Sequence, residues 1–343
     1  MRIRYYVIKR LILLFPYIIG LTIIVFLLKY AMEVKGMIPP FKLNPLYEYG
    51  IFLRDLFVGA WGYLPSNFPY FGGYPVIKAL GMAFPISFEL ILFASIIAFA
   101  VAIPLGIRMG QKQNFVASTL GRTFAFVGYS IPVYFLALLF IILFSTGGSV
   151  FTVKGGLPMS GIAALPYPTP SYVSIIGTSP YLTIVTGPTG LPLIDAIIHG
   201  NWFLAYNVFL HLILPVLALA YGIAGGFMIY LRSATSENSS MSYMTYARSQ
   251  GIPSKVLQQH HLARNSLAES LVFLGPLFAL MLGGVLIVEY IFSLPGIGLI
   301  AVDSIVYKAP YGLLGSIFFF GIILILANFI IDIVNVWLDP RLR

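Results

Sequence analysis

The sequence contains no cysteine, and only 9% of its 343 residues are charged. The absence of cysteine excludes disulfides, thiolate metal sites and cysteine nucleophiles. Soluble domains carry about 25% charged residues, so the low charge content argues against a soluble protein. Apolar residues are abundant instead: 59% of the chain is hydrophobic and the mean hydropathy is +0.94. This composition predicts an integral membrane protein.

The sequence also lacks a glycine-rich phosphate-binding loop with its lysine, which argues against ATP binding by this chain. Its four histidines are not spaced as a metal set, and two of them, His260 and His261, are adjacent and point to different helix faces. A net charge of +9 suggests nucleic acid in a soluble protein, but here the cations flank apolar runs. We therefore expect no cofactor, no metal, no nucleic-acid partner and no enzymatic activity in this chain.

Several apolar runs are long enough to cross a bilayer, which takes about 20 helical residues. The first lacks the short apolar region and small-residue cleavage site of a signal peptide, so we interpret it as a retained span. We predict an all-α bundle of six transmembrane helices at residues 11–28, 85–107, 117–144, 208–230, 267–292 and 313–337.

Lysine and arginine gather in alternate connecting segments, which predicts the orientation. Placing the N-terminus inside the cell puts more cations in the inner segments than in the longer outer ones. The inner set is Arg2, Arg4, Lys9, Arg10, Arg108, Lys112, Arg122, Arg232, Arg248, Lys255, Arg264, Arg341 and Arg343. The bias predicts a multi-pass plasma-membrane protein with both termini in the cytoplasm.

The spans divide the chain into alternating membrane and aqueous segments. In the outer segment 31–84, residues 47–57 fit a short interfacial helix. The outer segment 145–207 is rich in Gly, Pro, Ser, Thr and Tyr and allows short strands; an ordered cap and a partly disordered loop both fit it. The predicted organisation is 1–30 with the first helix, 31–84 outside, 85–144 with helices 2 and 3, 145–207 as the cap, 208–338 with helices 4 to 6, and a 339–343 tail.

The longest polar interval between apolar runs is residues 232–269, on the predicted cytoplasmic side. Serines at 239, 240 and 242 offer N-cap oxygens for a short helix, and Gly251 followed by Pro253 ends it. Tyr243 and Tyr246 are aromatic side chains on one face of that helix, and Ala247 is a point of close approach. A docking helix for a soluble partner and an ordinary interfacial loop both fit these residues.

The segment Tyr243-Met-Thr-Tyr-Ala-Arg-Ser-Gln-Gly251, followed by His261-Leu-Ala-Arg-Asn265, resembles the coupling-loop signature of ABC importer permeases. The form is that of the dipeptide/oligopeptide permease family, first-subunit type. Glu289-Tyr-Ile-Phe-Ser-Leu-Pro-Gly-Ile-Gly298 is similar to another motif of that family, and so is Leu338-Asp-Pro-Arg341. Thr245 and Tyr246 replace the first two positions of the general Glu-Ala-Ala signature, so a contact made by that glutamate does not carry over.

The resemblance implies a permease that forms a heterodimer with a second permease and works with two cytoplasmic ATPases and an extracytoplasmic solute-binding protein. ATP is then bound by the partner ATPases. The residues expected to couple to them, in the loop 232–266, are Tyr243, Tyr246, Ala247, Arg248, Gly251 and Ile252. Di- and oligopeptides are the implied substrates, with oligosaccharides as the alternative. A standalone channel or ion-coupled carrier is a further alternative, and it requires intramembrane acids on a continuous path.

Candidate side chains for the translocation path are Tyr129, Tyr134, Phe278, Met281 and Glu289. Core packing or lipid contact also explains the four apolar and aromatic ones. Glu89 and Glu289 lie near predicted span ends, where helix capping accounts for a carboxylate. Asn328 and Asp332, four residues apart on the sixth helix, are expected to make hydrogen bonds between helices.

Overall fold

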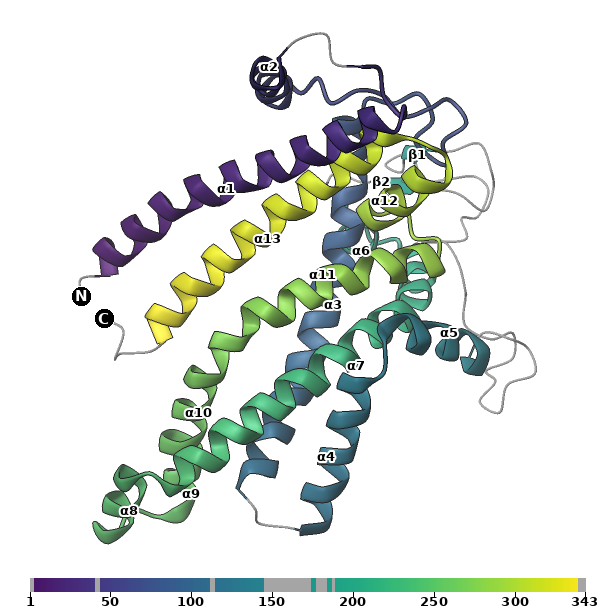
Figure 1. Cartoon of the computed structure of the whole chain (residues 1–343). Helices are drawn as coiled ribbons and strands as arrows, with labels where there is room; N and C mark the ends of the chain where they lie inside the picture. Colours follow the sequence, from purple (N-terminus) through teal and green to yellow (C-terminus); the bar gives the residue numbers. More distant parts are fainter. Residues whose placement is uncertain are drawn as a thin grey trace.

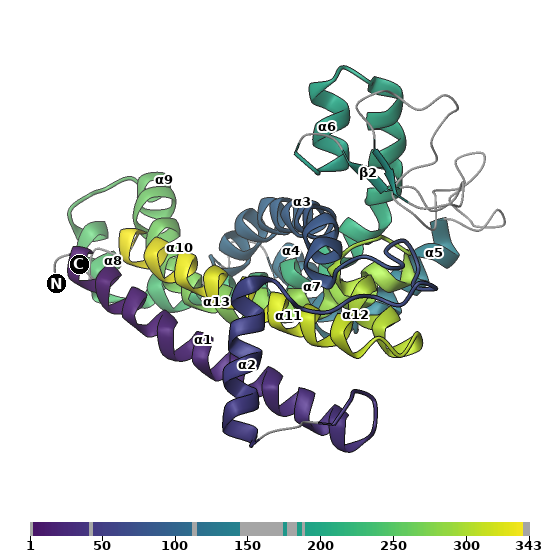
Figure 2. The same cartoon turned by 90° about the horizontal axis from the view of Figure 1, so that it is seen from above.

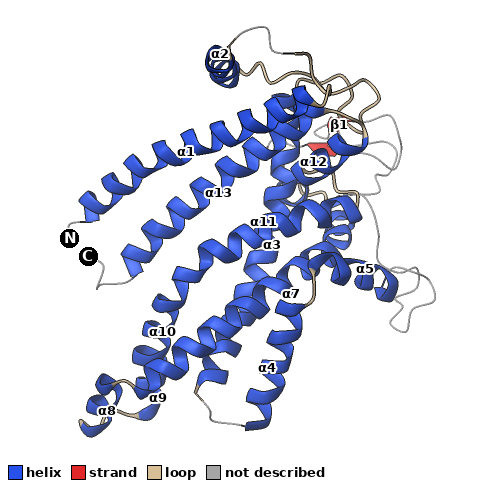
Figure 3. Ribbon diagram, in the orientation of Figure 1, coloured by secondary structure: helices blue, strands red, loops and turns tan. Residues whose placement is uncertain are grey.

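The computed structural model describes residues 3–40, 44–111, 115–144, 174–176, 184–186 and 189–338. Within these residues the chain is almost entirely helical, with one small two-stranded sheet (Figure 3). Five helical runs among the described residues are long and apolar enough to cross a membrane, and counting one bent pair of helices as a single span brings the number to six. The predicted all-α membrane fold is therefore confirmed.

The five unbroken runs extend further than the apolar stretches that predicted them. Helix α7 continues to Ser240, although its predicted span stopped at residue 230. The fifth run begins at Ser254, not at residue 267, and includes a π-helical turn and a 3-10 turn. The runs are α1 (Ile3–Val34), α3 (Val76–Gly110), α7 (Trp202–Ser240), α9 to α11 (Ser254–Val256, Ala263–Ser270 and Leu274–Ile291) and α13 (Pro310–Leu338).

The predicted third span, 117–144, is not one continuous helix. It consists of α4 (Phe115–Ser130) and α5 (Val133–Phe144), whose axes differ by 106°. Pro132 lies at the break; it has no N–H to continue α4, and it disfavours helical backbone at Ile131. The carbonyl of Pro132 instead accepts the N–H groups of Phe135 and Leu136 at 3.0 and 3.2 Å, which starts α5 in its new direction.

The molecule has two distinct ends (Figure 1). One, here called the α8 end, carries α8 (Ser242–Ser249), and both termini lie toward it. The other, the α2 end, carries α2 (Pro45–Val58), α6 (Pro192–Ile198) and α12 (Ile297–Val306). Helix α2 matches the helix predicted at 47–57, and it lies across α1 when the molecule is seen from above (Figure 2).

The predicted outer cap at 145–207 is only partly described. Residues 145–173, 177–183 and 187–188 lie outside the described residues. Strands β1 (Ser174–Ile176) and β2 (Ile184–Thr186) pair antiparallel, with Ile175 opposite Val185. Helix α6 and the start of α7 at Trp202 complete the described part, so the fourth span begins earlier than residue 208.

Helix α7 forms the centre of the bundle, while α1 and α13 lie at its edge. In the most apolar stretch of α7, 72% of residues are buried, compared with 17% in α1 and none in α13. Helices α4 and α7 approach closely at Gly225, where a Cβ atom would lie 2.6 Å from the Ala125 carbonyl oxygen. Small residues at such crossings let helix backbones meet in a membrane.

Helices α1 and α13 run side by side and are joined by an ion pair between Arg10 and Asp332, at 2.9 Å. Asp332 therefore links two helices, as expected. The amide nitrogen of Asn328 donates within α13, to the Leu324 carbonyl at 2.9 Å, and its amide oxygen lies close to where a side chain at Gly275 of α11 would begin.

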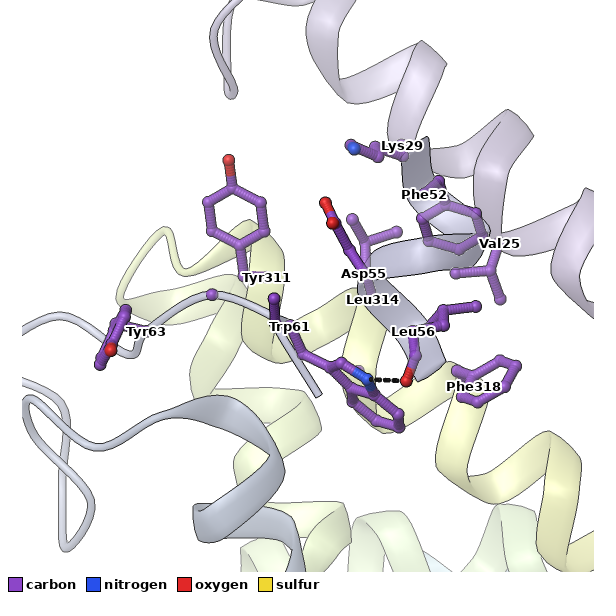
Figure 4. Close-up of a pocket in the computed structure, with 13 residues that line it drawn as sticks. Val25, Lys29, Phe52, Asp55, Leu56, Trp61, Tyr63, Tyr311, Leu314 and Phe318 are labelled. Carbon is purple, nitrogen blue, oxygen red and sulfur yellow. Dashed lines mark hydrogen bonds between the residues drawn. The ribbon is translucent and has the colours of Figure 1, made fainter. Parts of the chain in front are cut away.

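At the α2 end, a cavity of about 450 Å³ lies between α1, α2 and α13 (Figure 4). Trp61 closes one side: its indole N–H donates to the Leu56 carbonyl at 3.0 Å, and its ring meets Phe318 edge-on at 5.3 Å. Trp61 thereby fixes the chain after α2 against α13.

Candidate functional site

The predicted docking helix exists as α8, directly after α7, but serines do not cap it. Ser239 and Ser240 belong to the last turn of α7, where their hydroxyls donate to the carbonyls of Ser236 and Glu237 at 2.7 and 2.8 Å. The N-cap of α8 is Met241, whose side chain makes no capping hydrogen bond. Two of the three serines expected as caps therefore lie inside α7, and the third, Ser242, is the first residue of α8 itself.

One face of α8 packs on its own chain. Met244 and Ala247 are buried in a small cluster with Leu257 and Leu262, and Tyr243 and Ile252 pack against it. Tyr243 and Ala247 therefore pack between α8 and the rest of the chain, and their contact with a partner stays a prediction. The physical reason for this packing is the turn after α8, which brings Leu257 and Leu262 back under the helix.

A chain of hydrogen bonds connects α8 to α7 and, through α7, to α10. The Tyr243 hydroxyl donates to the side-chain oxygen of Asn238 at 3.1 Å, and the Asn238 amide nitrogen donates to Glu269 at 2.6 Å. Asn238 is buried at the end of α7, and Glu269 lies in α10. No local pattern in the sequence marks Asn238, because its partners are 5 and 31 residues away.

The opposite face of α8 is open. Tyr246 is 67% exposed, and Arg248 in the last turn is also exposed. Gly251 ends the helix as predicted, with a φ of +76° that disfavours other residues, and its N–H donates to the Arg248 carbonyl at 3.0 Å. A cavity of about 250 Å³ lies on the packed side of the helix, lined by Met244, Arg248, Ile252 and Leu262 among others.

Two of the five candidate path residues meet at one cavity. Tyr129 and Met281 line a space of about 210 Å³ where the α4–α5 break faces α7 and α11. Gly222 and Gly284 also line it, so small residues leave the space open. Neither Tyr134 nor Phe278 belongs to the lining: Tyr134 is 48% exposed on α5, and Phe278 packs on the core.

Glu289, the fifth candidate, is fully buried and bonded to backbone. Its carboxylate accepts the N–H groups of Gly298 and Leu299 at 2.7 and 3.3 Å, at the first turn of α12. Ser87 accepts the N–H of Ile297 at 2.9 Å beside it. The geometry places Glu289 as the residue that holds α12, away from the cavity at Tyr129 and Met281.

Glu89 has the same arrangement at the other short helix. It lies in α3, is fully buried, and accepts the N–H groups of Leu193 and Ile194 at 3.1 and 3.3 Å, in the first turn of α6. Unsatisfied N–H groups at a helix start favour a carboxylate. The capping interpretation of both glutamates agrees with this geometry.

Comparison with known proteins gives the chain its family. Residues 102–343 match the family model described as "Binding-protein-dependent transport system inner membrane component". The chain is 30% identical to a probable D,D-dipeptide transport system permease protein of Escherichia coli strain K12, over 87% of this chain and 81% of that protein.

Two further relatives cover most of the chain. A dipeptide transport system permease protein of Alkalihalophilus pseudofirmus is 28% identical over 98% of this chain and 99% of its own length. A putrescine export system permease protein of Escherichia coli strain K12 is 28% identical over 78% of each chain. The family match covers more than half of the sequence, and it includes the segment at α8. The chain therefore belongs to the binding-protein-dependent transport system inner membrane components, and it is a permease subunit of an ABC importer, as the resemblance in its sequence predicted.

Proposed function

We propose that this permease carries peptides through the membrane and that α8 is its contact with the cytoplasmic ATPases. The proposal places the α8 end and both termini in the cytoplasm. A second permease subunit, two ATPases and an extracytoplasmic binding protein complete the assembly, and the ATPases supply the nucleotide chemistry.

The orientation is supported by where the cations lie. Arg108 lies in the last turn of α3, Arg232 in the last third of α7, and Arg248 in α8. Lys255 and Arg264 follow in α9 and α10. Clusters of lysine and arginine next to membrane spans mark the cytoplasmic side.

The observation that carries the coupling proposal is the way α8 is held. It presents Tyr246 and Arg248 to the outside, while its inner face is packed and hydrogen-bonded through Tyr243 to Asn238 of α7, which in turn bonds to Glu269 of α10. A partner that displaces α8 therefore displaces the ends of both helices. Because α7 and the run that includes α10 and α11 line the cavity at Met281, that displacement reaches the proposed path.

This geometry suits a two-state transporter. The inward-open and outward-open states must differ in their contacts with nucleotide-bound and nucleotide-free ATPases, since a partner shifts an equilibrium only through differential affinity. Movement of packed helices as rigid units is an established way to make such a switch. The cavity where α4, α5, α7 and α11 meet is the part of this subunit that we assign to the path.

The proposed substrate class rests on the solutes for which similar proteins are named. Proteins named for dipeptide transport resemble this chain over 87% and 98% of its length. Another relative is named for putrescine export. Putrescine, like a peptide with a free amino terminus, carries a primary ammonium group. We therefore propose peptides with a free amino terminus as the substrates.

The coupling role is tested in the complete transporter, reconstituted in vesicles with its ATPases and binding protein. Truncating an exposed aromatic anchor at an interface costs about 2 kcal/mol or more, which corresponds to roughly 30-fold weaker binding. Tyr246→Ala and Arg248→Glu should each release ATPase subunits in mild detergent and reduce ATP-driven peptide uptake at least ten-fold.

The matched control is Tyr47→Ala. Tyr47 is similarly exposed, at 63%, but lies on α2 at the opposite end. It should leave both ATPase retention and uptake unchanged. Full ATPase retention by both α8 variants would refute the coupling role, and uptake of sugars in place of peptides would refute the substrate class.

A further inference from the structure

A second cavity, of about 440 Å³, opens at the α2 end, away from α8. Its wall is built from α5, the end of α11, α12 and the loop before α3. Leu138 and Ile141 contribute from α5, Tyr290 from α11, Tyr70 and Ser293 from loops, and Asp303 from α12.

Asp303 is the one charged side chain in that wall. It is only 8% exposed, and in the part of the chain that the structure describes its carboxylate has neither an ion pair nor a hydrogen bond. A carboxylate taken out of water without a partner is costly, so its environment favours a cation. Burial accordingly raises the pKa of Asp303 to about 6.

The cavity wall is held in an uncommon backbone conformation. Tyr70 and Ser293 have φ angles of +59° and +50°, although neither is glycine. The Tyr70 hydroxyl donates to the Ser293 carbonyl at 3.2 Å and so joins the two. Residues in such conformations persist where the surrounding structure enforces them, and they cluster at ligand-binding sites.

Glu289 gives Asp303 its position. By accepting the N–H groups of Gly298 and Leu299, it fixes the first turn of α12, one and a half turns before Asp303. Burial, and next the charge of Asp303, raise the pKa of Tyr70 to about 12, so this hydroxyl stays protonated and keeps its hydrogen bond to the Ser293 carbonyl.

The two cavities lie along the same pair of helices. Met281 and Gly284 line the inner one, while Tyr290 and Ile291 line the outer one, all on α11. Gly284 and Ile291 are about 10 Å apart along the helix axis, at 1.5 Å per residue. Helix α5 likewise contributes Val133 to the inner cavity and Leu138 to the outer. A solute at Asp303 is thus at the entrance to the proposed path.

We infer that the cavity at Asp303 binds the primary ammonium group of the transported solute as it enters from the binding protein. This rests on the proposed function, under which the group is a peptide's amino terminus. The carboxylate pairs with the ammonium, and the tyrosine rings and aliphatic side chains of Leu138 and Ile141 contact the first side chain of the peptide. Neutral oligosaccharides have no cationic group to pair with this carboxylate and offer it hydroxyl donors alone.

The first test measures uptake by the full transporter in vesicles, with the binding protein saturated by a tripeptide. Loss of a hydrogen bond to a charged group lowers binding about ten-fold or more, so Asp303→Asn should reduce uptake by that factor. Asp55→Asn is the control, since Asp55 lies at the same end but is paired with Arg54 at 2.8 Å and lines a different cavity. Uptake by Asp303→Asn equal to that of the wild type would overturn the inference.

The second test needs no change at Asp303. The chain has no cysteine, so Leu138→Cys places a unique thiol of this chain in the cavity wall. A tripeptide should slow its modification by a water-soluble thiol reagent, and the N-acetylated tripeptide should not. Equal protection by both peptides would overturn the inference.

A third measurement, with the diamine putrescine in place of the tripeptide, distinguishes failure of this inference from failure of the proposed function. Protection of the same thiol by putrescine alone would keep the ammonium site and refute peptides as substrates. If peptides are taken up but protect the thiol equally with and without a free amino terminus, the proposed function stands and the ammonium site at Asp303 is refuted. If Asp303→Asn fails to assemble, the Leu138→Cys measurement decides the matter by itself.

Discussion

At the scale of single residues, buried carboxylates in this protein serve as helix caps. Glu89 and Glu289 each lie on a long helix and accept backbone N–H groups from the first turn of a short one. Each carboxylate also interacts favourably with the positive end of the short helix's dipole. The long spans thereby position α6 and α12.

Gly296 offers a direct test of the cap at α12. A Cβ atom at this position would overlap the Glu289 carboxylate, although the backbone φ of −91° suits any residue. Forcing extra atoms into a packed site costs about 1–3 kcal/mol. Gly296→Ala should therefore lower the thermal midpoint of the purified complex.

The matched substitution is Gly283→Ala, in α11. A Cβ there meets no atom of this chain within 4 Å, so the midpoint should stay unchanged or rise slightly, since alanine favours helix. Equal midpoints for the two variants would show that Glu289 does not require the space at Gly296.

The sequence identified the two glutamates as costly charges near span ends, where a capping role is expected. It did not identify what they cap, because the N–H groups lie 104 residues away for Glu89 and 9 for Glu289. Nothing in the sequence near Asp303 marks it as part of a site. Its surroundings come from α5, α11 and a loop more than 200 residues earlier, and no local pattern reports that meeting.

At the scale of elements, the attachment of α8 to the end of α7 depends on Asn238. Tyr243→Phe keeps the ring in the hydrophobic cluster but removes the hydroxyl that donates to Asn238. Leaving a buried acceptor unpaired costs about 1–3 kcal/mol. Hydrogen exchange of the α8 amides should therefore speed up in this variant.

Tyr246→Phe is the natural comparison for Tyr243→Phe, because the Tyr246 side chain points away from the cluster and is 67% exposed. In the Tyr246→Phe variant, the α8 amides should exchange at the wild-type rate. Unchanged exchange in Tyr243→Phe would mean that apolar packing alone holds α8.

Element ends show where sequence reasoning works. Gly251 was correctly identified as the end of α8, because a positive φ strongly favours glycine. The starts were placed less well. Serines near 240 are typical of helix caps, but tertiary packing extends α7 through them. Pro132 breaks the third span, although the apolar run around it predicts one continuous helix.

At the scale of the whole molecule, the number of spans followed from run length alone, since a bilayer requires about 20 apolar helical residues. Their packing order did not follow from it. The central position of α7 and the edge position of α1 and α13 depend on small residues, such as Gly225, and on the contacts they permit. The arrangement leaves one end for α8 and the other for the cavity at Asp303.

The central claim is that α8 is the contact with the ATPases, and a single thiol tests it most directly. Tyr246→Cys adds a unique thiol of this chain to the exposed face of α8. In the assembled transporter, a short thiol-to-amine crosslinker should join it to an ATPase subunit, while Tyr47→Cys, at the opposite end, should give no such product. Absence of the ATPase product from Tyr246→Cys in an intact complex would contradict the account.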